Sequence, residues 1–384
     1  MKYALLSVAL IVALTAGFAI QAAAPQKASE TKSKTFQTKD YQIRVVTVTE
    51  GLSYPYSLNF LPDGTILIAQ LNGQLRAVRN AKLAPEVIKG VPEVHYVPGK
   101  GGLLDLSLHP KFAQNHWIYF TYDKPGPKGA TPALARGTLN GNQLSEVKDI
   151  VVPDAWGKED GHLGSYIRFT PDGLLYMSTG EREEPDRSQN MADDAGKVLR
   201  LRDDGTVPKD NPFVGKAGHS ERIFTYGHRD IHAMTVNPKT GDVWTAEHGD
   251  EVNIERTNTN YGWPYVSVSG QDNKPAPAGV KLSPPYLAWK NPTIQVSGMF
   301  FYTGDVFSKW KNNLFIGGLA AKGVERVAFA QDPPNTTPPA SNEVRELLFD
   351  IGHRVRDTKQ GPDGLIYFIT DEEQASLFRI EPVK

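Results

Sequence analysis

Apolar residues along this chain gather in many short runs rather than in long amphipathic stretches. Runs that begin at Tyr41, Trp117 and Leu365 are rich in β-branched or aromatic residues and are bounded by turn residues, as is typical of β-strands. We identify no amphipathic helix of three turns, because even the segment from Asp193 to Leu201 alternates too weakly. The pattern therefore predicts an all-β protein.

One short unit recurs along the chain. It consists of an apolar run, a turn of the Pro-Asp-Gly type and a second apolar run that often ends in Thr or Ala. Copies begin near Ser57, Leu106, Ile167, Met234, Met299 and Arg356. Their spacing of roughly 45 to 75 residues is that of one four-stranded blade with its loops. Six copies predict a six-bladed β-propeller of four-stranded antiparallel blades over residues 41–384, with a β-sandwich as the alternative.

The N-terminus has a different pattern. Lys2 precedes an almost uninterrupted apolar run from Ala4 to Ile20, which predicts a signal peptide over residues 1–24 and therefore a periplasmic or secreted protein. An uncleaved membrane anchor is the alternative, because the run is marginally long enough to span a bilayer. After cleavage we expect no stable membrane insertion. Residues 25–40 are rich in Lys, Ser, Thr and Gln, which predicts a disordered linker.

Composition narrows the classes of function. Cys is absent, which excludes disulfides and Cys-based metal or redox chemistry. The formal net charge is −1, which argues against nucleic acid as a partner. We find no second linker within residues 41–384, so we expect these residues to form one domain.

Polar residues beside the repeated unit are candidates for a ligand site, because the innermost strands of a propeller and their loops converge on its central channel. One such cluster holds His162 between glycines, with Asp160 nearby. Histidine is suited to act as a general base, and a carboxylate would orient its imidazole. The alternative is a histidine that only hydrogen-bonds its own loop.

Two further clusters are cationic. The first holds His228, Arg229 and His232 and suits anion binding or polarisation of a carbonyl. Metal ligation by its histidines would lack an evident third ligand, and a loop with a buried ion pair is the alternative. The second holds Arg354 and Arg356, which on a strand point to the same side. Their repulsion requires an anionic group between them, either a carboxylated ligand or the protein's own Asp or Glu.

A fourth cluster is acidic and runs from Glu247 to Asn253, followed by the segment from Asn260 to Pro264. Carboxylates and carbonyls in a Gly-bearing loop are the hard oxygen ligands that calcium prefers. A solvated acidic turn is the alternative interpretation.

Several sequence motifs, taken in order along the chain, resemble those of the soluble PQQ-dependent aldose sugar dehydrogenases, also called the glucose/sorbosone dehydrogenase family. The stretches that carry the resemblance are residues 101–112, 196–213, 226–229, 260–264 and 354–357. Together they extend the likeness over nearly all of the chain from Val45 to Ile380. The resemblance implies a six-bladed propeller that oxidises the anomeric hydroxyl of an aldose or similar polyol to a lactone. It also implies hydride transfer to PQQ and an external electron acceptor.

The resemblance implies roles for particular side chains. His162 matches the base that takes the proton from the anomeric hydroxyl, and Arg229 matches an arginine near the quinone and the sugar. Arg354 and Arg356 match a pair that faces the three carboxylates of PQQ. Trp289 is expected near the aromatic wall of the pocket.

Calcium is also implied by the resemblance, in two places. One ion sits on the cofactor, bound by carbonyls of a loop that is shortened here to Gly249, Asp250 and Glu251. A second ion stabilises the propeller, and its ligands match Glu251 and the carbonyl of Tyr261. PQQ and Ca²⁺ are therefore the expected cofactors.

The chain departs from the family pattern around the pocket. Lys100 stands where a cofactor-contacting Gln is usual, and Asp230 stands where Asn is usual. Tyr166 replaces an Arg, and Ala320 replaces a Lys or polar residue. These changes indicate a different sugar, an altered cofactor position or a lost cofactor. The alternative function is therefore a non-redox propeller that binds a carbohydrate or anion, and a third is a hydrolase or lactonase with protein-bound calcium.

Overall fold

The computed structural model describes residues 32–158, 161–268, 274–329 and 343–383. The expected signal peptide, residues 1–24, lies outside these ranges. Within them the helices are a four-residue α-helix, α1 (Phe112–Asn115), and two 3₁₀ turns, η1 (Pro185–Gln189) and η2 (Ser308–Trp310). None of these helices has the length and apolarity that a membrane crossing needs.

The strands form six antiparallel sheets, five of four strands and one of five. In each four-stranded sheet the strands lie side by side in chain order. The first two sheets are β3 (Pro55–Phe60), β4 (Ile66–Gln70), β5 (Leu75–Arg79) and β6 (Lys82–Leu83), and then β7 (Leu103–Leu108), β8 (Trp117–Gly126), β9 (Gly129–Asn140) and β10 (Gln143–Val151). The other three are β11 (Gly164–Phe169), β12 (Leu175–Thr179), β13 (Lys197–Leu201) and β14 (Ile223–Tyr226); β15 (Ile231–Val236), β16 (Val243–Glu247), β17 (Glu251–Ile254) and β18 (Leu287–Ala288); and β19 (Val296–Phe301), β20 (Leu314–Gly318), β21 (Gly323–Ala328) and β22 (Val344–Leu347).

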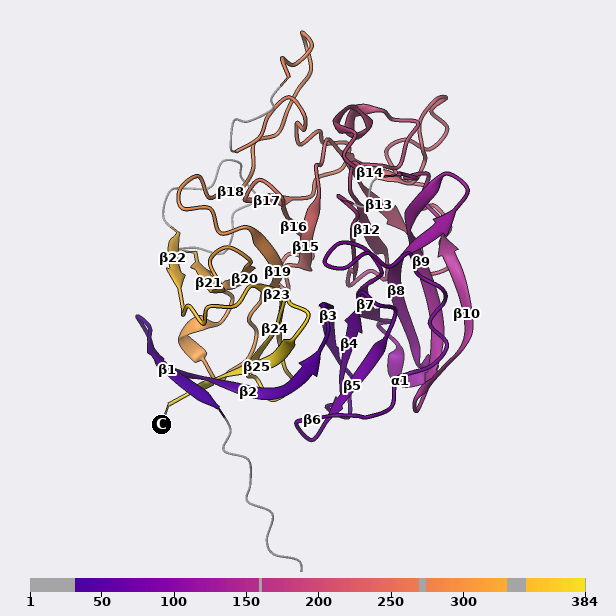
Figure 1. Cartoon of the computed structure of the whole chain (residues 1–384). Helices are drawn as coiled ribbons and strands as arrows, with labels where there is room; N and C mark the ends of the chain where they lie inside the picture. The colour runs from indigo at the N-terminus through magenta and orange to yellow at the C-terminus, as the bar shows by residue number, and fades with distance from the viewer. Residues whose placement is uncertain (1–31, 159–160, 269–273, 330–342, 384) are drawn as a thin grey trace, which may run out of the picture. The chain divides into compact units, whose positions relative to one another are not determined.

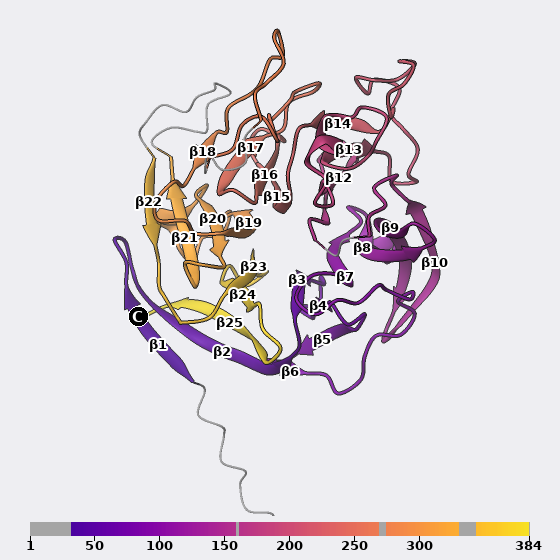
Figure 2. The same ribbon diagram turned by 45° about the horizontal axis from the view of Figure 1, so that its top comes forward.

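The sixth sheet joins the two ends of the described chain. Its order is β23 (Val355–Gln360), β24 (Ile366–Thr370), β25 (Ala375–Pro382), β2 (Gln42–Leu52) and β1 (Ser33–Gln37). β2 pairs with β25 in a register that places Val45 opposite Ile380, and it is seen beside β25 in Figures 1 and 2. The prediction of a disordered linker over residues 25–40 is wrong for residues 33–37, because they pair with β2.

The sheets are the six blades of a β-propeller, which confirms the prediction from the repeats. Strands β3, β7, β11, β15, β19 and β23 are the innermost, and each contacts the innermost strand of the next sheet until β23 meets β3 again. The turn of the repeated unit joins the first two strands of a blade. At β11 and β12, for example, Asp172 Oδ1 accepts the Leu174 N–H at 3.3 Å, and Gly173 adopts a φ of 83°, a conformation that glycine reaches without steric cost.

Apolar side chains pack mainly between neighbouring blades. One cluster joins Ala69 of β4 to Leu103 and Phe120 of the next blade, and another joins Phe315 of β20 to Phe368 of β24. Each fully buried side chain of this kind contributes about 1.5–3 kcal/mol of transfer free energy. The core therefore holds the blades as a ring and leaves the starts of the innermost strands free to carry polar groups.

Candidate active site

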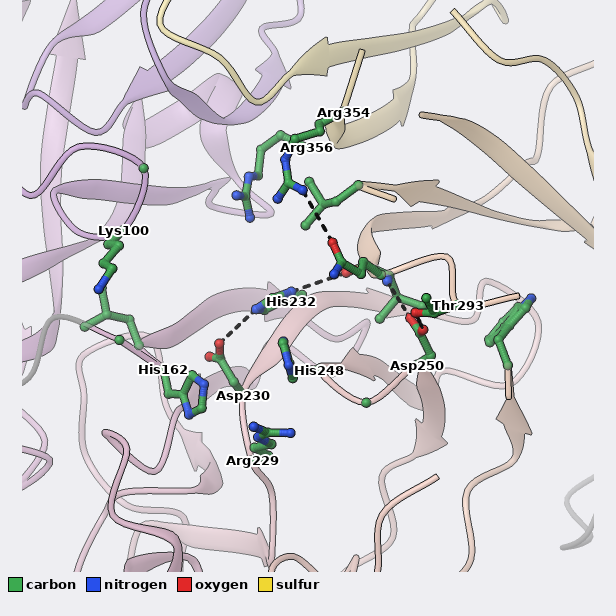
Figure 3. A pocket seen from close by; sticks show the side chains of 18 of the residues that line it. Lys100, His162, Arg229, Asp230, His232, His248, Asp250, Thr293, Arg354 and Arg356 are labelled. Carbon is green, nitrogen blue, oxygen red and sulfur yellow. Dashed lines mark hydrogen bonds and ion pairs between the residues drawn. The ribbon is translucent and has the colours of Figure 1, made fainter. Parts of the chain in front are cut away.

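A cavity of about 560 Å³ is lined by residues at, or just before, the starts of the innermost strands of all six blades, and by residues that follow β12, β16, β18 and β20. The expected residues found in its wall are Lys100, His162, Arg229, Asp230, Gly249, Trp289, Arg354 and Arg356. Figure 3 shows the labelled side chains among them directed toward one space. The expectation that polar residues beside the repeated unit converge is therefore confirmed.

His162 is oriented by a carboxylate that follows β12, the second strand of the same blade. Its Nδ1 lies 2.6 Å from Oε2 of Glu181, which is buried, and Nε2 has no hydrogen-bond partner among the residues described. Burial opposes protonation of His162, but the hydrogen bond with Glu181 and the charge of Asp230 outweigh it and raise its pKa. An imidazole held in this way presents a basic Nε2 to the cavity.

Asp160 was the carboxylate expected to orient His162, and it lies outside the described residues. Glu181 was not identified from the sequence, because it lies 19 positions after His162. Its signal was its place directly after Gly180, at the end of β12, the strand that pairs with β11. A Cβ at residue 180 would lie 1.9 Å from the carbonyl oxygen of His162, so only glycine allows the two backbones to come this close.

Asp230 ties the loop of His162 to the neighbouring blades. Its Oδ1 accepts the Gly164 N–H at 2.8 Å, and its Oδ2 lies 2.8 Å from Nε2 of His232. The other ring nitrogen of His232 lies 3.3 Å from the carbonyl oxygen of Val296. Burial opposes the ionisation of Asp230, but the charge and hydrogen bond of His232 hold its pKa below the usual range. Asp230 therefore enters the site as an ionised, internally bonded carboxylate.

His248 is a third histidine in the cavity wall, and the sequence reasoning did not single it out. Its ring centroid lies 5.7 Å from that of His162 and 5.7 Å from that of His232. Burial and the neighbouring charges of His232 and Arg229 lower its pKa to about 4. It is therefore neutral near pH 7 and adds no positive charge to the cavity.

Arg354 and Arg356 share a carboxylate that the sequence reasoning missed. Asp371 Oδ2 lies 3.2 Å from Nε of Arg354 and 2.8 Å from Nη2 of Arg356. Burial alone would raise the pKa of Asp371, and the two guanidinium groups hold it below the usual range. Asp371 therefore neutralises one of the two positive charges of the arginines, and one positive charge remains in excess.

Three more cations, Lys100, Arg229 and Lys290, line the cavity without a side-chain hydrogen bond or ion pair to the described residues. The guanidinium of Arg229 lies 4.5 Å from the ring centroid of Trp263, and its buried Nε has no hydrogen-bond partner there. Lys100 is exposed and extends from its loop toward His162 (Figure 3). Together with the excess charge at Arg354 and Arg356, these groups make the wall suited to an anionic ligand.

The family model for Glucose / Sorbosone dehydrogenase matches residues 52–379. The chain belongs to this family. It is 34% identical over 357 residues to aldose sugar dehydrogenase YliI of Escherichia coli K12, which covers 88% of this chain and 93% of that protein. It is 26% identical over 462 residues to quinoprotein glucose dehydrogenase B of Acinetobacter calcoaceticus, covering 96% and 92% of the two chains.

A solved structure gives the same result for the fold. The apo-form crystal structure of the soluble aldose sugar dehydrogenase from Escherichia coli superposes with a TM-score of 0.81 at 32% identity, covering 89% of this chain and all of that one. The resemblance inferred from the sequence motifs is thus confirmed at the level of family and fold.

The family's acidic cluster is buried beside the cavity. Asn253 Nδ2 donates to Glu247 at 2.9 Å and to Glu251 at 3.1 Å, while its Oδ1 is buried without a partner among the described residues. His228 contacts Glu247 at 3.0 Å, and the ring of Tyr261 stacks on His228 at 4.9 Å. Burial and the negative charge of Glu247 raise the pKa of Glu251 to about 8. Glu251 therefore holds its proton near pH 7 unless a cation lies beside it.

The histidines of the second cluster are not brought together as metal ligands. His228 is bonded within the acidic cluster, whereas His232 is bonded to Asp230. Among the described residues, no group of three or more His, Asp or Glu side chains is arranged to hold a metal ion. Both histidines thus take part in buried ion pairs, as the alternative interpretation of this cluster proposed.

The short loop at Gly249 is committed to contacts within the protein. Asp250 Oδ1 accepts the Val296 N–H at 3.0 Å, Oδ2 accepts the hydroxyl of Thr293, and the backbone carbonyl accepts the Trp289 N–H at 2.9 Å. Figure 3 shows Asp250 turned toward Thr293. The oxygen atoms of Asp250 are therefore engaged by donors, and calcium binding by the Gly249 carbonyl stays a prediction.

Trp289, the expected aromatic wall, and the two remaining departures from the family pattern, Tyr166 and Ala320, lie around the cavity in different ways. Trp289 lines it while its indole N–H donates to Glu325 at 2.7 Å. Tyr166 is fully buried, with its ring 5.6 Å from that of Tyr56, which lines the cavity. Ala320 donates its N–H to the Ile294 carbonyl at 3.0 Å, and it is its neighbour Leu319 that lines the cavity. Of these three, only Trp289 is placed to touch a ligand.

Proposed function

We propose that this protein oxidises an aldose or similar polyol at the anomeric carbon, with PQQ as cofactor and an external electron acceptor. The observation that carries the proposal is the His162–Glu181 pair, which presents a basic nitrogen to a cavity lined by unpaired cations. Family membership and the names of its relatives, an aldose sugar dehydrogenase and a quinoprotein glucose dehydrogenase, support it.

The residues of the cavity fit a cofactor with three carboxylates. Arg354, Arg356 and Lys100 would pair with them, and the unpartnered Nε of Arg229 offers a further donor. Trp289 would supply an aromatic surface. PQQ, when bound, supplies the quinone that accepts the hydride.

The protein's part in the reaction is proton transfer and orientation. Nε2 of His162 takes the proton of the anomeric hydroxyl as the carbon–hydrogen bond breaks and the lactone forms. Glu181 accepts the hydrogen bond from Nδ1 throughout and stabilises the imidazolium that results. Asp230 holds the backbone of the same loop through Gly164, which keeps the base at a fixed position.

Calcium fits the acidic cluster. Glu251 is a buried carboxylate next to a second carboxylate, beside an orphaned Asn253 oxygen, and hard oxygen donors of this kind suit Ca²⁺. We therefore place a stabilising calcium ion at Glu251, with the carbonyl of Tyr261 as the further ligand implied by the family. We derive no catalytic step from calcium at Gly249.

A second candidate function is a non-redox propeller that binds a carbohydrate or other anion in the same cavity. Asp371 already partners Arg354 and Arg356, so this part of the wall is stable without a carboxylated cofactor. We further propose that the protein is exported, on the strength of the N-terminal apolar run.

The decisive test is the His162→Ala variant of the PQQ-loaded protein, assayed by sugar-dependent reduction of a dye. Loss of a general base lowers turnover by about 10²–10⁴-fold. The matched control is His353→Ala, because His353 is exposed, pairs with Glu372 and does not line the cavity. Unchanged turnover in His162→Ala would refute the proposed mechanism.

A further inference from the structure

The segment that carries Glu181 wraps around the loop of His162. Glu181 bonds the imidazole, and Arg182 donates from Nη1 to the carbonyl oxygen of Gly161 at 2.9 Å. Oε2 of Glu181 also accepts the N–H of Glu183 at 3.1 Å. One carboxylate oxygen therefore positions both the proposed base and the backbone of Glu183.

This segment adopts a conformation that ordinary residues avoid. Arg182 has a φ of 63° and Glu183 a φ of 60°, in the left-handed region where side chains other than glycine are disfavoured. Two such residues in succession persist only where the surroundings enforce them, and such strain concentrates at functional sites. Gly at residue 183 would adopt this backbone without steric cost, whereas Glu carries a conformational penalty there.

The carboxylate of Glu183 lies directly against the residue before the base. A Cβ at Gly161 would be 1.8 Å from Oε1 of Glu183. Glycine at residue 161 thus makes room for this carboxylate beside His162, and Glu183 lines the cavity.

Glu183 differs from the other carboxylates in the cavity wall. Asp230 accepts hydrogen bonds from Gly164 and His232, and Asp250 accepts them from Val296 and Thr293. The side chain of Glu183 is exposed and has no hydrogen-bond or ion-pair partner in the described part of the chain. Its acceptor oxygens are free for a ligand.

We propose that Glu183 is a substrate-binding residue that sets the charge preference of the site. An ionised carboxylate only accepts hydrogen bonds, so Glu183 binds hydroxyl groups of the sugar next to the carbon that loses its hydride. An ammonium group at the same place binds more strongly through a charge-assisted hydrogen bond, and a carboxylate on the sugar is repelled. The substrates it selects are neutral aldoses and amino sugars, and uronic acids are rejected. This inference rests on the proposed function.

The test compares PQQ-loaded wild type, Glu183→Gln, Glu183→Gly and the matched control Glu184→Gln, whose side chain lies outside the cavity and pairs with Arg187. Each is assayed with D-glucose, D-glucosamine and D-glucuronate, and its thermal midpoint is recorded. We expect Glu183→Gln to lower kcat/KM for glucosamine about tenfold, mainly through KM, and to raise it for glucuronate. Glu183→Gly loses the same preference while its thermal midpoint is unchanged or higher. Glu184→Gln behaves as wild type.

The outcomes separate this inference from the function on which it rests. Active wild type together with Glu183 variants that keep its KM values and its order of preference overturns the role of Glu183 alone. A lower thermal midpoint in Glu183→Gly also overturns it, because the side chain would then be structural. Wild type that oxidises no sugar after PQQ loading overturns the proposed function, and the role of Glu183 with it.

Discussion

Two groups of buried charge in this propeller are unbalanced in opposite directions. In one, Arg354 and Arg356 share Asp371, so positive charge is in excess. In the other, Glu247 and Glu255 contact His228, the one cation there among the described residues, and Glu251 lies beside Glu247, so carboxylates are in excess. Burying charge is costly unless it is compensated.

The difference indicates what each group is built to hold. The arginine group lines the cavity and suits an anion, whereas the glutamate group is buried outside the cavity lining and has more carboxylates than His228 can balance. The neighbouring charges also act in opposite senses: the arginines lower the pKa of Asp371, while Glu247 adds to the effect of burial in raising the pKa of Glu251. Under the proposed function, charge complementarity would favour the arginine group for the cofactor and the glutamate group for calcium.

The largest expected effect comes from removing the one carboxylate of the arginine group. Asp371→Asn leaves the buried guanidinium of Arg356 without a counter-charge, and breaking a buried pair in this way costs about 3–5 kcal/mol of unfolding free energy. Urea denaturation of the cofactor-free protein measures it. A loss below about 1 kcal/mol would show that solvent already compensates Arg356.

The glutamate group predicts a response to calcium. Calcium at 100 times its Kd should add about 2.7 kcal/mol of stability to wild type and raise the thermal midpoint. Glu251→Gln should abolish this gain, because it removes the charged ligand. Glu183→Gln, a carboxylate change in the cavity, should retain it. An equal response in all three proteins would place calcium elsewhere.

Substitution of Arg354 should change the affinity for PQQ far more than the free energy of unfolding. Its side chain is 42% exposed, so Arg354→Gln should change the unfolding free energy by no more than about 0.5 kcal/mol. The loss of a charge-assisted hydrogen bond should nevertheless weaken PQQ binding about tenfold. Absorbance titration measures the affinity, and an unchanged Kd would remove Arg354 from the anion site.

The smallest expected effect is a displacement of the pH profile. A base must be neutral, and the pKa of His162 is raised, so kcat/KM should increase with pH as the imidazolium loses its proton. Glu181→Gln removes the hydrogen-bonded charge while burial continues to oppose protonation, so the acidic limb should move to lower pH. If the acidic limb of the kcat/KM profile stays in place in Glu181→Gln, the titrating group is a residue other than His162.

The repeats and motifs predicted the six four-stranded blades and much of the cavity wall. They did so because turn chemistry and strand patterns are local, and because the start of every innermost strand faces the channel. His162, Arg229 and Arg356 were found in this way.

The carboxylates that complete the site were not predicted. Glu181 and Asp371 follow strands adjacent to those of their partners, and their pairing depends on strand register, which composition does not reveal. Asp250 was assigned to a loop that holds calcium, and only the structure shows its oxygens engaged by Val296 and Thr293. Residues 33–37 were too polar to indicate a strand, and they acquire one by pairing with β2.

The most direct test of the central claim is titration of the purified cofactor-free protein with PQQ, followed by absorbance and by dye reduction over a panel of aldoses. The account predicts binding of one PQQ per chain and sugar-dependent reduction of the dye. Absence of binding at micromolar PQQ, with or without calcium, would contradict it and assign the cationic cavity to a ligand other than this cofactor.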